Sequence, residues 1–173
     1  MRMAVGILLL VSCWGGFGCG YHTAGHVVTL PDSVHTIAIP AFVNTSQAYR
    51  VEQMMTAAVI REFTTRTHYR IAHEPGEDTD ATLSGTIIST SQIPTTYDSQ
   101  TGRTSTVQIA VSMSVTLTDR RGKILYQNPS YLFRDNYQVP QQLISFFQED
   151  TPALQRLSRD FAHTLVSDIL EGY

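Results

Sequence analysis

The clearest pattern in this 173-residue sequence is the stretch Val107-Gln108-Ile109-Ala110-Val111-Ser112-Met113-Ser114-Val115-Thr116-Leu117. Large apolar residues alternate with small or polar ones along its whole length. A period of two is typical of a β-strand that buries one face. The stretch therefore predicts a long strand that packs its aliphatic side chains against a second layer, while its other face carries no charge.

Two more long strands are predicted on either side of this one. Residues 81–96 are rich in Thr, Ser and Ile, and residues 124–139 follow a tight turn at 119–123. The polar segment 97–103 predicts a hairpin loop between the first two strands. Asn128-Pro129 predicts a bend or bulge in the third strand, because proline cannot donate a ladder hydrogen bond. The three strands are expected to form an antiparallel meander.

Two segments have apolar residues at helical spacing. The first is 49–66, with Ser46 or a neighbour as its expected N-cap, and the second opens at Thr151-Pro152 and ends near Gly172. Short strands are predicted at 35–42 and 69–73. The order β-α-β-β-β-β-α predicts an α+β fold, a two-layer sandwich. Two helices would pack on one face of a four- to five-stranded, mostly antiparallel sheet, with Pro40 at an edge or a strand end.

The N-terminus has the anatomy of a secretory signal. Arg2 supplies a positive charge, and residues 4–11 form an apolar run that is shorter than the ~20 residues a spanning helix needs. The expected organisation is a lipoprotein signal peptide over 1–18, a linker over 19–34 that is lipidated at Cys19, and a folded domain over 35–173. More than one acyl chain, palmitate among them, would hold the exported domain on a membrane.

Two alternatives to this N-terminal prediction stay open. Leu10-Val11-Ser12-Cys13 is the better local match to a lipoprotein cleavage motif, but cleavage there leaves a signal of only 12 residues. A plain secretory signal with two incidental cysteines is the other alternative. Since both cysteines lie in the first 20 residues, no disulfide framework is expected in the folded body.

Composition and motifs argue against several classes of protein. Twelve basic residues against 15 acidic ones give a net charge of −3, or −4 once residues 1–18 are removed. Nucleic-acid binding would need a basic excess. Phosphate-binding, dinucleotide-binding, zinc-protease and serine-hydrolase motifs are all missing from the sequence. His22 and His26 have i,i+4 spacing, but Gly25 between them argues against a helix. We therefore expect no enzyme, cofactor or metal site.

Two features favour binding. The first is a set of basic residues on the two turns of the meander, which are expected at opposite ends of the sheet: Arg103, Arg120, Arg121 and Lys123. Arginine is suited to phosphate because its planar fork makes two parallel hydrogen bonds. The alternative is that these residues only keep the turns soluble.

The second feature is the neutral face of the central strand, which includes Gln108, Ser112, Ser114 and Thr116. A free sheet face usually carries Lys or Glu, which prevent association. A neutral polar face is suited to burial against another polar surface. The alternative is a Ser- and Thr-rich sheet in contact with solvent.

Several segments resemble members of the LptE family, the lipopolysaccharide-assembly lipoproteins of the outer membrane. In order they are Cys19-Gly20-Tyr21-His22, residues 37–45, the helix that carries Glu52 and Arg61-Glu62-Phe63, residues 81–87, and Val115–Asp119 before Gly122. The resemblance implies a non-enzymatic domain with two helices and four strands. It also implies a position inside the LptD β-barrel, facing the periplasm or within the lumen, a role in barrel assembly, and a role in delivering lipopolysaccharide to the outer leaflet.

A second resemblance is kept as an alternative. A strand that ends at Phe42-Val43-Asn44-Thr45, followed by an amphipathic helix and a short strand, is also similar to periplasm-facing lipoproteins that activate a cell-wall synthase or join a secretion pore. The long neutral strands and Cys19-Gly20-Tyr21-His22 favour the LptE family over this alternative.

Overall fold

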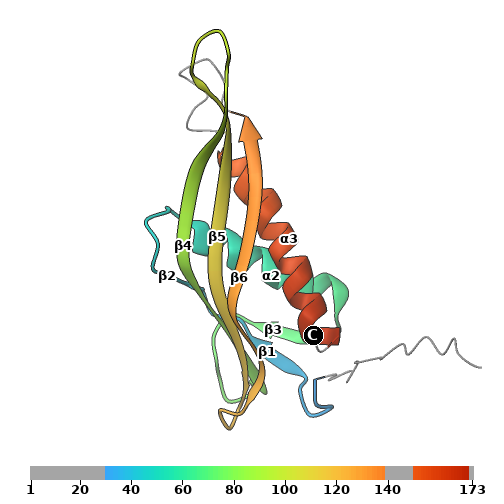
Figure 1. Ribbon diagram of the computed structural model, residues 1–173. Coiled ribbons are helices and arrows are strands. Elements are labelled where there is room, and N and C mark those ends of the chain that lie inside the picture. The colour runs from blue at the N-terminus through green and yellow to red at the C-terminus, as the bar shows by residue number, and fades with distance from the viewer. Residues whose placement is uncertain (1–29, 139–149, 172–173) are drawn as a thin grey trace, which may run out of the picture.

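The computed structural model describes residues 30–138 and 150–171 (Figure 1). The elements, in chain order, are β1 (Thr36–Ala38), β2 (Val43–Asn44), α2 (Val51–Arg66), β3 (Arg70–Ala72), β4 (Ala81–Tyr97), β5 (Thr104–Asp119), β6 (Ile124–Gln138) and α3 (Asp150–Glu171). The predicted signal peptide, Cys13, Cys19 and the His22–His26 pair lie outside the described residues. Within the described ranges, neither helix has the apolar length that crossing a membrane requires.

The strands form one mixed sheet with the order β3-β1-β4-β5-β6, and β2 pairs with β4 beyond the end of β1. The long pairs β4–β5 and β5–β6 are antiparallel, whereas β1 and β2 pair in parallel with their neighbours. This confirms the predicted α+β class and the meander. The bulge predicted at Asn128-Pro129 is also confirmed, because the register between β5 and β6 shifts there.

The strand predicted at 35–42 is shorter in the structure, and a second short strand follows just after the predicted range. β1 ends at Ala38 and β2 begins at Val43, with Pro40 between them. β1 lies between β3 and β4, so Pro40 marks the end of a strand and not an edge of the sheet. The missing N–H of proline explains the interruption.

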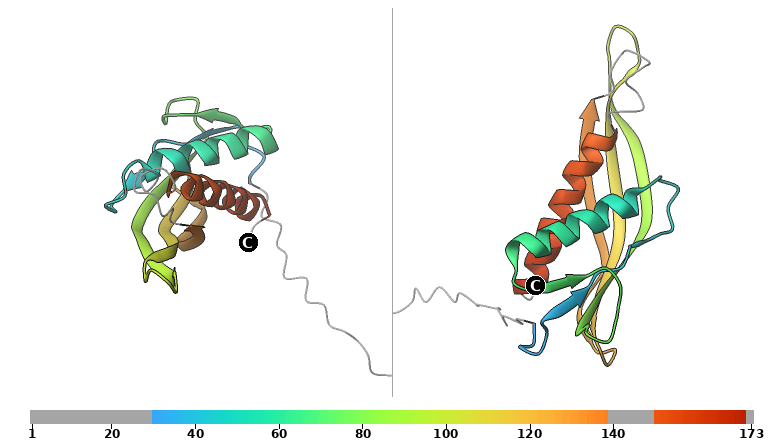
Figure 2. Two further views of the ribbon diagram at one scale, coloured as in Figure 1. Left: turned by 90° about the horizontal axis from the view of Figure 1, so that it is seen from above. Right: turned by 180° about the vertical axis from the view of Figure 1, so that it is seen from behind.

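Both helices cover the same face of the sheet (Figures 1 and 2). The alternating apolar residues of β5, from Ile109 to Leu117, are buried together with Leu157 and Phe161 of α3 and Met55 of α2. The period-two pattern thus places one face of β5 in the core and leaves the other uncovered by the helices. Leu30 and Val34, in the segment predicted as linker, are also buried in this core.

The predicted N-cap of the first helix is wrong. Helix α2 begins after Arg50, which has a left-handed backbone (φ 60°) and makes no side-chain cap bond. Ser46 is used within the preceding loop: its hydroxyl contacts the Asn44 carboxamide oxygen at 2.8 Å and the Thr90 hydroxyl at 3.1 Å. The Arg50 guanidinium lies over the Tyr49 ring instead, 4.8 Å from the ring centre.

Candidate functional site

The uncovered side of the three long strands is the candidate binding surface, and we call it the open face. Side chains directly opposite one another in paired strands project from the same face. The register therefore places on the open face Thr82, Ser84, Thr86, Ser89, Ser91 and Ile93 of β4, Gln108, Ala110, Ser112, Ser114, Thr116 and Thr118 of β5, and Ile124, Gln127, Leu132, Arg134 and Asn136 of β6. The four predicted residues Gln108, Ser112, Ser114 and Thr116 thus lie side by side along its central strand.

The open face is neutral except at one position. Arg134, opposite Ala110, is the one charged member of the set. Sequence reasoning misses it, because the alternation of β5 says nothing about what β6 places beside it. Three large apolar side chains are half exposed on the same face, Ile93 at 53%, Ile124 at 51% and Leu132 at 48%.

This composition determines what the open face can do. Hydroxyls and carboxamides both donate and accept hydrogen bonds, so they can be satisfied by a polar surface or by water. Neutral groups also lose less hydration free energy on burial than charged ones. The open face can therefore be covered by a polar wall at low cost.

The basic turn residues lie at two ends of the sheet, as predicted (Figure 1). Arg103 follows the β4–β5 turn, whereas Arg120, Arg121 and Lys123 belong to the β5–β6 turn. The side chain of Arg120 is engaged within the domain: its Nε donates to the Thr79 carbonyl at 2.8 Å, and the guanidinium lies 3.4 Å from the Asp80 carboxylate. Arg120 thus holds the β5–β6 turn against Thr79 and Asp80.

Asp80 is an unpredicted anchor beside this turn. One carboxylate oxygen accepts the backbone N–H groups of His35 and Thr36 at 2.9 and 3.0 Å. These two hydrogen bonds, followed by the nearby charge of Arg120, lower the pKa of Asp80. The sequence of the acidic segment 74–80 predicts only a solvated loop, since nothing in it indicates that its last carboxylate holds the start of β1.

The β5–β6 turn does not form a purely cationic patch. The Asp119 carboxylate accepts the backbone N–H groups of Arg121 and Lys123, each at 2.8 Å. Glu77 and Asp78 directly precede Thr79, which is bonded to Arg120. An anion approaching Arg121 or Lys123 therefore also meets several carboxylates.

A polar cluster joins the last strand to the last helix. The Tyr131 hydroxyl, on β6, donates to the Asp168 carboxylate of α3 at 2.5 Å and is hydrogen-bonded to the hydroxyl of Tyr126. Burial, followed by the hydrogen bond to Asp168, raises the pKa of Tyr131. The cluster ties the two elements together. In the described part of the chain, no group of three acidic, His or Cys side chains is placed to hold a metal ion.

Comparison with known structures shows which class of protein has this architecture. Lipoprotein B from Nitrosomonas europaea is 13% identical with a TM-score of 0.56, over 87% of this chain and 90% of that one. The rare lipoprotein B from Shewanella oneidensis is 11% identical with a TM-score of 0.53, over 74% and 92%. A lipoprotein from Caulobacter crescentus is 10% identical with a TM-score of 0.52, over 75% and 88%. The chain therefore has a fold of bacterial lipoproteins.

The family is shown by the sequence itself. A family model described as "LptE: Lipopolysaccharide-assembly" matches residues 34–169, which span nearly all of the described domain. The chain belongs to the LptE family, as its motifs had indicated, and so to the outer-membrane lipoproteins of lipopolysaccharide assembly. No curated protein sequence matches the chain.

Proposed function

We propose that this protein is a non-enzymatic outer-membrane lipoprotein that fills the lumen of an LptD-type β-barrel. It helps this barrel assemble and assists the delivery of lipopolysaccharide to the outer leaflet. Membership of the LptE family supports the general role. The observation that carries the barrel-filling role is the open face, with a single charge among its side chains.

The physical match is between two polar surfaces. The interior of an outer-membrane barrel is lined by polar side chains. A domain inside it needs many neutral hydrogen-bonding groups and few charges that would lose their hydration. Gln108, Ser112, Ser114 and Thr116 would contact this wall, with Ile93 and Leu132 as apolar contacts.

The anchor and the glycolipid contacts are further parts of the proposal. Acylation of Cys19 would hold the protein on the membrane, with Cys13 as the alternative residue. Arg103, Arg121 and Lys123 are candidates for lipopolysaccharide phosphates, because none of these side chains makes an ion pair within the described ranges. Arg120 can take part only if it gives up its contacts with Thr79 and Asp80.

Co-purification from detergent-solubilised membranes tests the barrel partner. We expect the tagged wild-type protein to recover a large heat-modifiable β-barrel, and the double variant Ser112→Glu/Thr116→Glu to lose it, because two carboxylates would be buried without partners. The matched control Thr64→Glu/Thr65→Glu places the same charges on exposed positions of α2. Recovery of a cell-wall synthase or a secretion-pore component, without a barrel, would contradict the proposal and favour the regulator alternative.

A further inference from the structure

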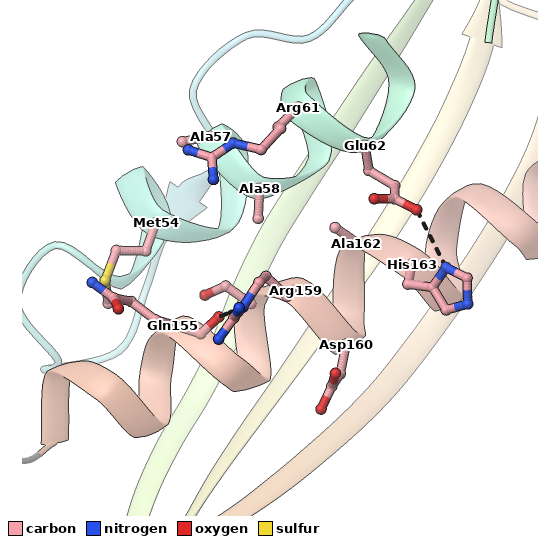
Figure 3. A pocket seen from close by; sticks show the side chains of 11 residues that line it. Met54, Ala57, Ala58, Arg61, Glu62, Gln155, Arg159, Asp160, Ala162 and His163 are labelled. Carbon is pink, nitrogen blue, oxygen red and sulfur yellow. Dashed lines mark hydrogen bonds and ion pairs between the residues drawn. The ribbon is translucent and has the colours of Figure 1, made fainter. Parts of the chain in front are cut away.

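A second surface lies on the helix layer, where α2 and α3 pack against one another (Figure 3). A groove of about 620 Å³ separates their outer parts. Its apolar lining consists of Met54, Ala57 and Ala58 of α2 and Ala162 of α3. Alanine side chains at these positions leave room that longer side chains would fill.

Two arginines stand on opposite walls of this groove, Arg61 on α2 and Arg159 on α3 (Figure 3). Both are exposed. Neither makes an ion pair in the part of the chain that the structure describes, and Arg159 donates only to the Gln155 carbonyl one turn earlier in its own helix, at 3.3 Å. The two positive charges are therefore available to a ligand.

The carboxylates of the same groove do not neutralise these arginines. Glu62 lies 3.2 Å from His163 Nδ1 and 3.3 Å from the Arg66 guanidinium, so it is already paired. Asp160 also lines the groove, but its side chain extends from α3 on the side away from α2 (Figure 3). The end of the groove near Met54 and Gln155 is thus cationic, and the other end is occupied by the Glu62–His163 pair.

We propose that the α2–α3 groove binds an acidic polypeptide segment, with one carboxylate on Arg61, another on Arg159, and apolar side chains against Met54 and the alanines. A planar guanidinium binds a carboxylate through two parallel hydrogen bonds. This surface is on the opposite layer from the open face. The inference therefore goes beyond the barrel-filling role and does not depend on it.

The arrangement favours an extended ligand over a single phosphate. The two guanidinium groups come from different helices, with the groove between them (Figure 3). One compact anion would have to draw both side chains to a single point, whereas a peptide offers separate carboxylates along its length. The Gln155 carboxamide, which lines the same end, can bond a peptide group.

Titration of the detergent-solubilised full chain with a hexaglutamate peptide, followed through the ¹⁵N–¹H signals of arginine side chains, tests the proposal. We expect the Arg61 and Arg159 signals to shift together and saturate, while the signal of Arg70, which is exposed on β3, stays in place. Arg61→Gln and Arg159→Gln should each weaken binding about tenfold, as expected for the loss of a charged hydrogen-bonding partner. Arg70→Gln, an equally exposed substitution on β3, should leave the affinity unchanged.

Three outcomes would overturn the proposal. Equal shifts at all exposed arginines would mean non-specific attraction. Saturation by inorganic phosphate without binding of the peptide would identify a phosphate site instead. No shift at Arg61 and Arg159 at millimolar peptide, with the spectrum of the folded domain intact, would mean that the groove is not an anion site.

Discussion

At the scale of single residues, packing leaves very little room where β4 crosses the loop before β2. A methyl group added at Gly85 would lie 2.9 Å from the Phe42 ring, which is itself buried in the core. The backbone of Gly85 has the conformation of an ordinary strand, which any residue could adopt. Glycine is required here because the Phe42 ring approaches so closely.

Gly85→Ala is therefore predicted to destabilise the domain. Overpacking of this kind costs about 1–3 kcal/mol in the free energy of unfolding, which urea denaturation would measure. Gly76→Ala is the matched control, because a Cβ there meets no atom within 4 Å. Equal stability of the two variants would mean that Phe42 moves aside without cost.

The second prediction for a single residue concerns Asp80 and the pH dependence of stability. The pKa of Asp80 is lowered in the folded protein, so its ionised form is favoured by folding. The stabilisation is present above the pKa of the unfolded chain and is lost as the pH falls through the lower, folded pKa. Asp80→Asn should therefore lower the Tm at neutral pH, and the difference from wild type should shrink in acid.

Asp78→Asn is the control for this titration, because Asp78 lies in the same acidic segment and is exposed. Thermal melts of the three proteins between neutral and acidic pH provide the comparison. A Tm difference between Asp80→Asn and wild type that stays constant down to the lowest pH would contradict the role assigned to the carboxylate.

At the scale of elements, periodicity predicts the strands and helices well and their partners poorly. The alternation over 107–117 identifies β5 and its buried face, and apolar spacing locates α2 and α3. The parallel pairing of β1 with β3 and β4 could not be predicted, because a three-residue strand carries no information about its neighbours. The N-cap prediction fails because Ser46 bonds within its own loop.

The contact between β6 and α3 joins two elements that the sequence does not show to be neighbours. Tyr131 and Asp168 are 37 residues apart, and only the fold brings the hydroxyl to the carboxylate. Tyr131→Phe removes the donor and leaves a partly buried carboxylate with only the 3.4 Å contact to Tyr126. The expected loss is about 1–3 kcal/mol in the free energy of unfolding.

Hydrogen exchange should localise this effect. We expect Tyr131→Phe to increase amide exchange in α3 and β6 more than in β1 and β3, which lie at the other end of the strand order. Tyr97→Phe is a suitable control, because Tyr97 is 61% exposed at the hairpin tip. A uniform increase across the sheet would mean that the cluster does not specifically join these two elements.

At the scale of the whole molecule, the domain has two unlike sides. The sheet side is neutral and rich in hydroxyls, with Arg134 as its one charge, whereas the helix side carries the groove with Arg61 and Arg159. The neutral residues of β5 can be predicted from the sequence. Arg134 and the groove cannot, because each depends on residues that only the tertiary structure brings together.

The neutral sheet side is the basis of the proposed position inside a barrel, and site-specific photo-crosslinking in living cells tests this position most directly. One variant carries the crosslinking residue at Ser112, on the open face. A control variant carries it at Gln100, which is exposed in the turn between β4 and β5. The two positions differ in whether the proposed barrel wall would cover them.

We expect the Ser112 probe to be captured by one large outer-membrane β-barrel, and the Gln100 probe to give this product weakly or not at all. A Ser112 probe that yields no barrel adduct, in cells where the protein is folded and exported, would contradict the proposed position inside a barrel.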